Sequence, residues 1–150
     1  MTAKTETGNR ELSVSRIVDA PVSLVYEVWT NPDHIRHWWG PNGFTNTIDK
    51  MDVRKGGEWQ FTMHGPDGTD YRNECVYDEV EKERRLVYTH LSGPKFQATV
   101  TFEALGDKTR VSIRSEFESA EQLEQVIKVF KADEGMRQNI DRFEAYLAKL

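Results

Sequence analysis

Four histidines are the side chains in this 150-residue sequence best suited to proton or metal chemistry. His34 and His37 are three residues apart, a spacing that places both on one face of a helix, where they could bind a metal ion. A metal site needs three or four ligands, and neither a cysteine nor a further histidine stands at the usual spacing from this pair. The sequence therefore predicts no metal site, and no cofactor is expected.

The other two histidines lie in segments whose apolar residues alternate, as in β-strands. His64 precedes the turn Gly65–Gly68, where an imidazole is expected to hydrogen-bond to the turn backbone. His90 falls on the same side of its segment as Tyr88, and it is expected to be a polar group inside the protein. Catalysis by His90 would need a partner carboxylate and a substrate within hydrogen-bond reach, and the sequence indicates neither. No catalytic residue is predicted.

Large aromatic residues are numerous, with four Trp, five Tyr and seven Phe. Trp59, Phe61 and Met63 share one face of a predicted strand, and Tyr71 and Asn73 fall on the next one. An aromatic surface with a few polar groups is typical of a site for a small apolar molecule. For any single residue, ordinary core packing is the alternative.

Trp38 and Trp39 close a short predicted helix. Neighbouring helical residues point about 100° apart, so at most one of the two rings can face fully inward. One ring is expected to cover a ligand and the other to anchor the core. The complete set of expected cavity-lining residues is Trp38, Trp39, Phe44, Trp59, Phe61, Met63, Tyr71, Asn73, Tyr88, His90, Val100, Met136 and Ile140.

The remaining reactive groups have ordinary interpretations. No G-x-S-x-G, H-E-x-x-H or G-x-x-x-x-G-K-[ST] string occurs. Cys75 is the single cysteine, so no intrachain disulfide can form, and an inert buried thiol is expected. Asp52 and Arg54 share a strand face, where an exposed ion pair would contribute less than about 1 kcal/mol.

Composition limits the class of protein. Hydrophobic residues make up 37% and charged residues 30% of the chain, a globular balance. The net charge of −5 argues against a nucleic-acid partner, since phosphate binding requires a concentrated positive face. No apolar run approaches the roughly 20 residues of a membrane span, so no membrane partner and a cytoplasmic location are expected. The length fits one domain over residues 1–150, with residues 1–10 as a flexible tail.

The elements that must position these side chains can be read from periodicity. A first strand is expected at residues 11–18, although Arg16 interrupts its alternation and indicates a bulge or a paired arginine. Pro21 and Asn31-Pro32 then begin two short helices. Six further strands joined by short turns are expected at residues 44–53, 58–64, 70–80, 85–91, 96–105 and 109–117.

One face of these strands is apolar and the C-terminal segment is expected to cover it. Ser119 and Gln122 form a capping-box pattern that begins a helix, and its apolar stripe changes register near residues 131–133, which predicts a break there. The predicted fold is α+β: a seven-stranded antiparallel sheet wrapped around a long C-terminal helix, with two short helices after the first strand.

This order, together with several local strings, resembles a known family. The strings are Trp38–Pro41 (WWGP), Gly43–Phe44 (GF), Asp52–Gly57 (DVRKGG), Met63–Gly68 (MHGPDG), Arg85–His90 (RLVYTH) and Glu134–Met136 (EGM). They resemble bacterial relatives of the C-terminal domain of the activator of heat-shock protein 90 ATPase, in the START-like, birch-pollen-allergen-like (SRPBCC) superfamily. The resemblance implies a helix-grip fold from about Leu12 onward; it does not fix a function, because this fold has several.

Three functions stay open. The leading one is a non-enzymatic binder of a small hydrophobic or amphipathic ligand held between the sheet and the C-terminal helix. A protein-interaction module with a chaperone or other protein as partner is implied by the resemblance. A cyclase-like or hydrolase-like enzyme would have to use Tyr71, Asn73, Tyr88 and His90 in the same cavity. The oligomeric state and the ligand's identity are not predicted.

Overall fold

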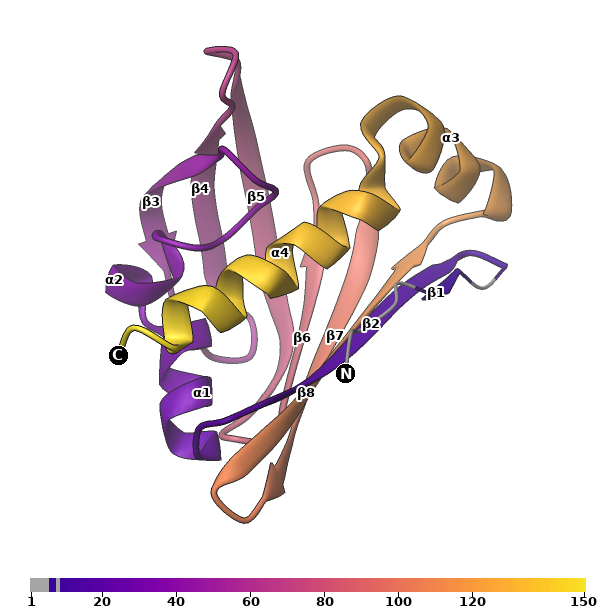
Figure 1. The fold of residues 1–150 in the computed structure, drawn as a ribbon. Helices are drawn as coiled ribbons and strands as arrows, with labels where there is room; N and C mark the ends of the chain where they lie inside the picture. The colour runs from indigo at the N-terminus through magenta and orange to yellow at the C-terminus, as the bar shows by residue number, and fades with distance from the viewer. Residues whose placement is uncertain (1–5, 8) are drawn as a thin grey trace.

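A single antiparallel sheet curves around a C-terminal helix in the computed structural model, which describes residues 6–7 and 9–150 (Figure 1). The strands follow the spatial order β1-β2-β8-β7-β6-β5-β4-β3, so β3 to β8 form a meander and β2 returns beside β8. Their bounds are β1 Glu6–Thr7, β2 Glu11–Val18, β3 Thr45–Met51, β4 Glu58–His64, β5 Asp70–Glu81, β6 Arg85–His90, β7 Phe96–Leu105 and β8 Lys108–Phe117.

The alternation of the sequence places one apolar face of this sheet inward. A row across β4 to β8 joins Trp59, Cys75, His90, Phe96 and Phe117 through successive strand pairs. Residues that lie directly opposite each other on neighbouring strands point to the same face of the sheet, so all members of this row face the same side. The row forms part of the concave face.

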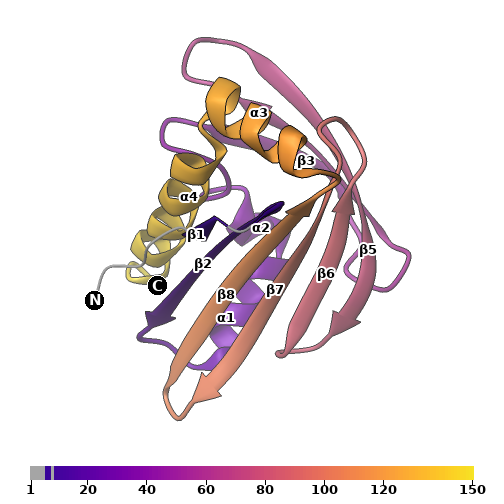
Figure 2. The same ribbon diagram turned by 90° about the vertical axis from the view of Figure 1, so that its right-hand side faces the viewer.

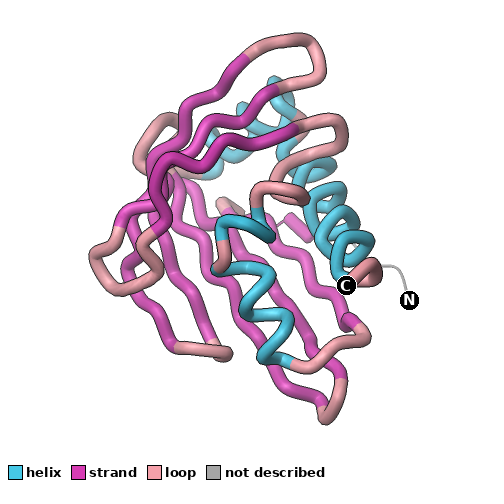
Figure 3. Tube along the Cα trace, turned by 90° about the vertical axis from the view of Figure 1, so that its left-hand side faces the viewer, coloured by secondary structure: helices cyan, strands magenta, loops and turns pink. Residues whose placement is uncertain are grey.

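The helices lie on that concave side, as Figures 2 and 3 show for the longer ones. Their bounds are α1 Val22–Thr30, α2 Pro32–Ile35, α3 Ala120–Phe130 and α4 Ala132–Leu147. The Ser119 side chain accepts a hydrogen bond from the backbone N–H of Gln122, as the capping pattern predicts. Between α3 and α4, Lys131 adopts a left-handed backbone with φ of 52°, which makes the predicted break.

The strands agree with the sequence prediction, with two differences. The seven predicted strands are all present, and Glu6–Thr7, expected in a flexible tail, pair with Leu12 and Ser13 as an additional strand. Residues 1–5 and 8 of that predicted tail lie outside the described part. Several strand ends move by one or two residues. Arg16 is paired and not bulged, since β2 pairs with β8 without interruption.

Arg16 projects from β2 toward α4. Its guanidinium lies 2.7 Å from Asp141 and 2.8 Å from Glu144. The Arg16 side chain is only 9% exposed, whereas the two carboxylates reach the surface. These two ion pairs thus attach β2 to α4.

The C-terminal half of α4 fills the sheet's curve. Ile140, Phe143 and Leu147 are buried in one cluster with Trp29 and Trp38. Phe143 meets the rings of Trp29 and Trp38 at centroid distances of 5.6 Å and 5.1 Å. No helix in residues 9–150 is long and apolar enough to cross a membrane.

Candidate ligand-binding cavity

The N-terminal half of α4 leaves a cavity of about 930 Å³ above the sheet. Its boundary includes Ala132 and Gly135 on the helix and Ser115 on β8, all small side chains. Further along α4 the large Ile140 and Phe143 occupy the corresponding space. Side-chain volume along one helix therefore decides where the interior is filled and where it is hollow.

Most of the residues predicted to line a cavity border this one. Trp38, Val100 and Ile140 do not, because each is fully covered by core neighbours. The predicted residues that do line it are Trp39, Phe44, Trp59, Phe61, Met63, Tyr71, Asn73, Tyr88, His90 and Met136.

The two adjacent tryptophans lie just beyond α2, which ends at Ile35 and not at Trp39 as predicted, and their rings have different surroundings. The Trp38 indole N–H donates to the backbone carbonyl of Val28 at 3.3 Å, and its ring packs on Trp29 and Phe143. Trp39 is half-buried and borders the cavity. Trp38 is thus the core anchor, and Trp39 is the ring available to a ligand.

Aromatic rings form one wall of the cavity around Trp59. Phe61 stacks on Trp59 with 4.5 Å between ring centroids, while Trp39 and Tyr88 approach edge-on at 5.1 Å and 5.4 Å. Such arrangements add stabilisation beyond burial alone, so the buried rings of Trp59, Phe61 and Tyr88 are held in place before any ligand enters.

The loop of residues 39–44 forms another wall, and α4 holds it. The Arg142 guanidinium donates to the carbonyls of Trp39, Gly40, Pro41 and Phe44 at 3.2, 2.9, 2.7 and 2.9 Å. The Asn139 side chain accepts from the Gly40 N–H at 3.0 Å. The backbone polar groups of this loop are thereby satisfied without a regular element.

The backbone conformation of Gly40 requires glycine in this loop. Its φ of 98° lies in the region that glycine adopts without strain. A Cβ at this position would also come within 2.6 Å of the Met63 methyl group, but that methyl is the end of a flexible side chain and could shift. The glycine is therefore needed for the turn of the chain at this position.

His90 is the buried polar group that the sequence predicted at this site. Its Nδ1 donates to the Pro94 carbonyl at 2.9 Å, and its Nε2 lies 2.6 Å from Asn73 Oδ1. The second contact is a hydrogen bond only when Nε2 is also protonated, since an amide oxygen only accepts. Burial opposes that charge and lowers the pKa of His90, although the Pro94 bond acts in the other direction. The ring is therefore neutral at neutral pH.

The other ionisable groups of the cavity floor are also neutral. Burial raises the pKa of the Cys75 thiol to about 12. Burial raises the pKa of the Tyr88 phenol well above its usual value, and the nearby Cys75 adds to this shift. Neither group is activated as a nucleophile or base.

Charged and exposed apolar residues gather at the rim. Asp70, Arg72, Lys131 and Glu134 border the cavity and are exposed. Val129 and Phe130, at the C-terminal end of α3, also border it although 60% and 63% of their surface is exposed. The interior is thus mainly apolar with several aromatic rings, and the rim carries charges and two exposed apolar side chains.

The remaining histidines make side-chain contacts. His64 bridges Asp70 at 2.7 Å and Thr47 at 2.8 Å, so the predicted contact with turn backbone is wrong; the side chain lies across neighbouring strands. His34 lies 2.7 Å from the Tyr146 hydroxyl.

Among the residues described, no group of three or more His, Cys, Asp and Glu could hold a metal ion. Asp52 and Arg54 form the predicted ion pair at 2.7 Å.

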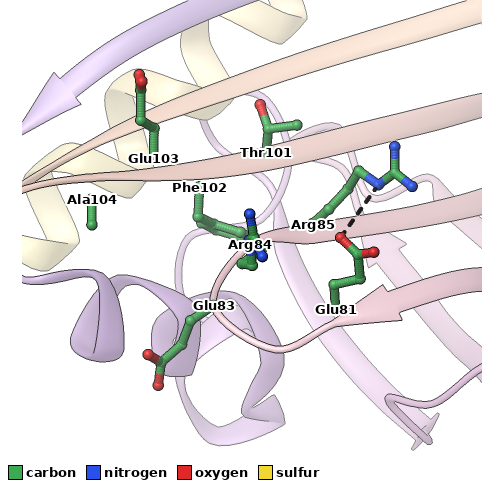
Figure 4. A pocket seen from close by; sticks show the side chains of 8 residues that line it. All are labelled: Glu81, Glu83, Arg84, Arg85, Thr101, Phe102, Glu103 and Ala104. Carbon is green, nitrogen blue, oxygen red and sulfur yellow. Dashed lines mark ion pairs between the residues drawn. The ribbon is translucent and has the colours of Figure 1, made fainter.

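A second, smaller hollow of about 430 Å³ lies between the β5–β6 turn and β7 (Figure 4). Its Arg85 pairs with Glu81 at 3.9 Å and with Glu79 at 3.0 Å, so its charge is already compensated. Phe102 in its wall packs on Tyr26. The larger cavity is the better candidate because it is deeper in the fold and combines apolar walls with neutral polar groups.

Sequence reasoning missed part of the boundary. The helix α3, expected only as a cover, contributes Val126, Val129 and Phe130, and the loop contributes Pro41 and Asn42. The missed residues of the sheet face are Leu12, Cys75, Phe96, Ile113, Ser115 and Phe117. For these the alternation was visible, because each lies at an inward position of its strand. What it could not reveal was which inward positions α4 leaves uncovered.

Comparisons with known proteins agree with this geometry. A family model described as "Activator of Hsp90 ATPase homolog 1-like protein" matches residues 19–148. A solved structure from Arthrobacter aurescens is 27% identical with a TM-score of 0.93, and the match covers 100% of this chain and 94% of that one. One from Nitrosomonas europaea is 24% identical with a TM-score of 0.85, over 96% and 97% of the two chains. An AHSA1-like protein from Aeromonas hydrophila is 20% identical with a TM-score of 0.74, over 93% and 92%. No curated protein matches.

Proposed function

We propose that this chain, which belongs to the family of activator of Hsp90 ATPase homolog 1-like proteins, binds a small hydrophobic or amphipathic molecule in the cavity beneath α4. The observation that carries the proposal is the cavity itself. Its volume of about 930 Å³ falls in the range of known small-molecule sites, and its lining is mostly apolar, with aromatic rings around Trp59. A cytoplasmic location belongs to the same proposal.

Binding without chemistry is the simplest use of these groups. The Cys75 thiol and Tyr88 phenol are protonated because both are buried, and the His90 Nδ1–H is engaged by the Pro94 carbonyl. A group that acts as nucleophile or base needs a pKa matched to its task. These side chains are suited to orienting a ligand.

The test is to measure the protein's mass under native and then denaturing conditions and to identify any molecule released. A discrete small molecule lost on denaturation supports the proposal and gives the ligand class. For a protein that is purified empty, binding of an apolar fluorescent dye replaces this measurement.

Two variants on α4 make the test specific. Met136→Arg puts a charge into the cavity wall, and we expect it to reduce binding by at least ten-fold because the charge would have to be desolvated. Ala145→Arg adds the same side chain on an exposed position of the helix and should bind as the wild type does. Equal binding by folded Met136→Arg and Ala145→Arg would refute the cavity as the site.

The exposed Val129 and Phe130 support a second candidate function, docking of a partner protein such as a chaperone. Enrichment of a partner from the organism's own extract, lost in a Val129→Ser/Phe130→Ser variant, would favour this function. Equal recovery by the variant and the wild type would exclude these two side chains as the docking surface.

A further inference from the structure

We propose that the molecule held in this cavity is uncharged and carries an oxygen that accepts a hydrogen bond from the indole N–H of Trp59. This inference rests on the proposed cavity-binding function and names the chemical class of the ligand. A ketone, an ester or an ether on an apolar skeleton fits; a free carboxylate does not.

The first step is the state of the Trp59 side chain. Trp59 borders the cavity and is 2% exposed, and its Nε1 is buried with no hydrogen-bond partner in the described chain. A buried donor left unpaired costs roughly 1–3 kcal/mol. A ligand oxygen that reaches this N–H removes that cost, so the site favours a ligand with an acceptor over one without.

The second step is access. The Trp59 N–H is closed off from water in the free protein. Trp39, which meets Trp59 edge-on at 5.1 Å, is half-buried and is therefore the ring that an incoming ligand can displace. Phe61 and Tyr88, which also contact the Trp59 ring, are fixed by burial and would contact the ligand's apolar skeleton.

The third step is charge. The floor near Trp59 offers neutral donors, the Tyr88 hydroxyl and the Cys75 thiol, whereas the cations that border the cavity, Arg72 and Lys131, lie at its exposed rim. At the rim, Arg72 is paired with Asp49 at 2.6 Å. A carboxylate taken to the depth of Trp59 would be desolvated without a counter-ion, which is far more costly than burying a neutral carbonyl.

The experiment compares 9-fluorenone with fluorene, two probes of the same shape that differ in one carbonyl. Dissociation constants are measured for the wild type, Trp59→Phe and Trp29→Phe. Trp29→Phe is the matched control because its indole N–H is also buried and unpaired, yet Trp29 does not border the cavity. We expect the fluorenone-to-fluorene affinity ratio to fall about ten-fold in Trp59→Phe, as loss of one buried hydrogen bond implies, and to stay within two-fold in Trp29→Phe.

An infrared measurement on the wild type alone gives an independent result. The carbonyl stretch of bound fluorenone should lie below its frequency in a hydrocarbon solvent, because a hydrogen bond weakens the C=O bond. An unshifted stretch overturns the inference even where Trp59→Phe fails to fold.

The remaining outcomes separate this inference from the function on which it rests. An affinity ratio unchanged in folded Trp59→Phe overturns the Trp59 assignment and leaves cavity binding intact. Tighter binding of fluorene-9-carboxylate than of fluorenone at neutral pH overturns the uncharged class. Failure of the wild type to bind any of the three probes overturns both proposals.

Discussion

Replacing Arg142 with methionine tests how α4 holds the cavity wall formed by residues 39–44. The substitution keeps an unbranched side chain of similar length and removes the four hydrogen bonds that the guanidinium donates to loop carbonyls. Because Asn139 and Gln138 still bond the N–H groups of Gly40 and Asn42, the loop loses part of its attachment and not all of it.

The expected loss can be worked from these bonds. Nη1 has two hydrogens for its three carbonyls, so the four contacts amount to about three full hydrogen bonds. A hydrogen bond from a charged donor contributes about 1.5 kcal/mol net, so together they would contribute about 4 kcal/mol. Arg142 is only half-buried, and water can replace roughly half of these contacts. We therefore expect Arg142→Met to lower the free energy of unfolding by about 2 kcal/mol, equivalent to a fall of about 6 °C in Tm for a chain of this length.

Urea denaturation provides the assay, with Arg137→Met as the matched control on the same helix. Arg137 forms an exposed ion pair with Asp141 at 3.7 Å, so its loss should cost less than about 1 kcal/mol. Hydrogen exchange of the Gly40 and Asn42 amides should also accelerate in Arg142→Met. Equal stability of the two variants, with unchanged exchange at these amides, would refute the assigned role of Arg142.

Three further predictions concern other parts of the fold. The pKa of His90 is lowered in the folded protein, so below about pH 6.5 the unfolded chain binds a proton that the folded protein takes up only at lower pH. Stability should thus fall from pH 7.5 to 5.5 in urea titrations, and less so in His90→Gln; an equal slope would contradict this. The double variant Asp141→Asn/Glu144→Gln leaves the buried Arg16 without counter-charges and should lower the free energy of unfolding by about 3 kcal/mol. Arg16→Met should cost less, because it leaves two exposed carboxylates unpaired and not a buried charge. A lower unfolding midpoint for Arg16→Met than for the double variant would contradict this prediction. Ser119→Ala removes the cap of α3 and should cost about 1 kcal/mol by thermal unfolding, and an unchanged Tm would show that the cap contributes little.

Much of the fold could be predicted because its signals are local. Alternation placed the seven strands, and Ser119 and the change of apolar register at Lys131 placed the two C-terminal helices. Strand β1 was missed since a two-residue pairing has no periodicity to detect. Arg16 stood out in its strand, but only the fold could identify Asp141 and Glu144, more than a hundred residues away, as its partners.

The candidate site was less predictable because a cavity depends on where the packed helices and strands leave space unfilled. Periodicity gave Trp59, Tyr88 and Val100 the same inward direction, yet Val100 is covered by the core and the other two border a cavity. That difference arises from where α4 crosses the sheet. No sequence signal marked Arg142, whose partners are backbone carbonyls and therefore leave no pattern of residue types.

The division of α4 into two halves has a consequence for how this family can change. Ala132, Glu134, Gly135 and Met136 border the cavity, whereas Ile140, Phe143 and Leu147 hold the sheet. Substitutions at these four positions can alter what is accommodated without removing the contacts of Ile140, Phe143 and Leu147 or the bonds of Gln138 and Asn139 to the loop. A library confined to those four positions should therefore yield mostly folded proteins with new ligand preferences, so that one helix gives the fold its capacity to acquire new specificities.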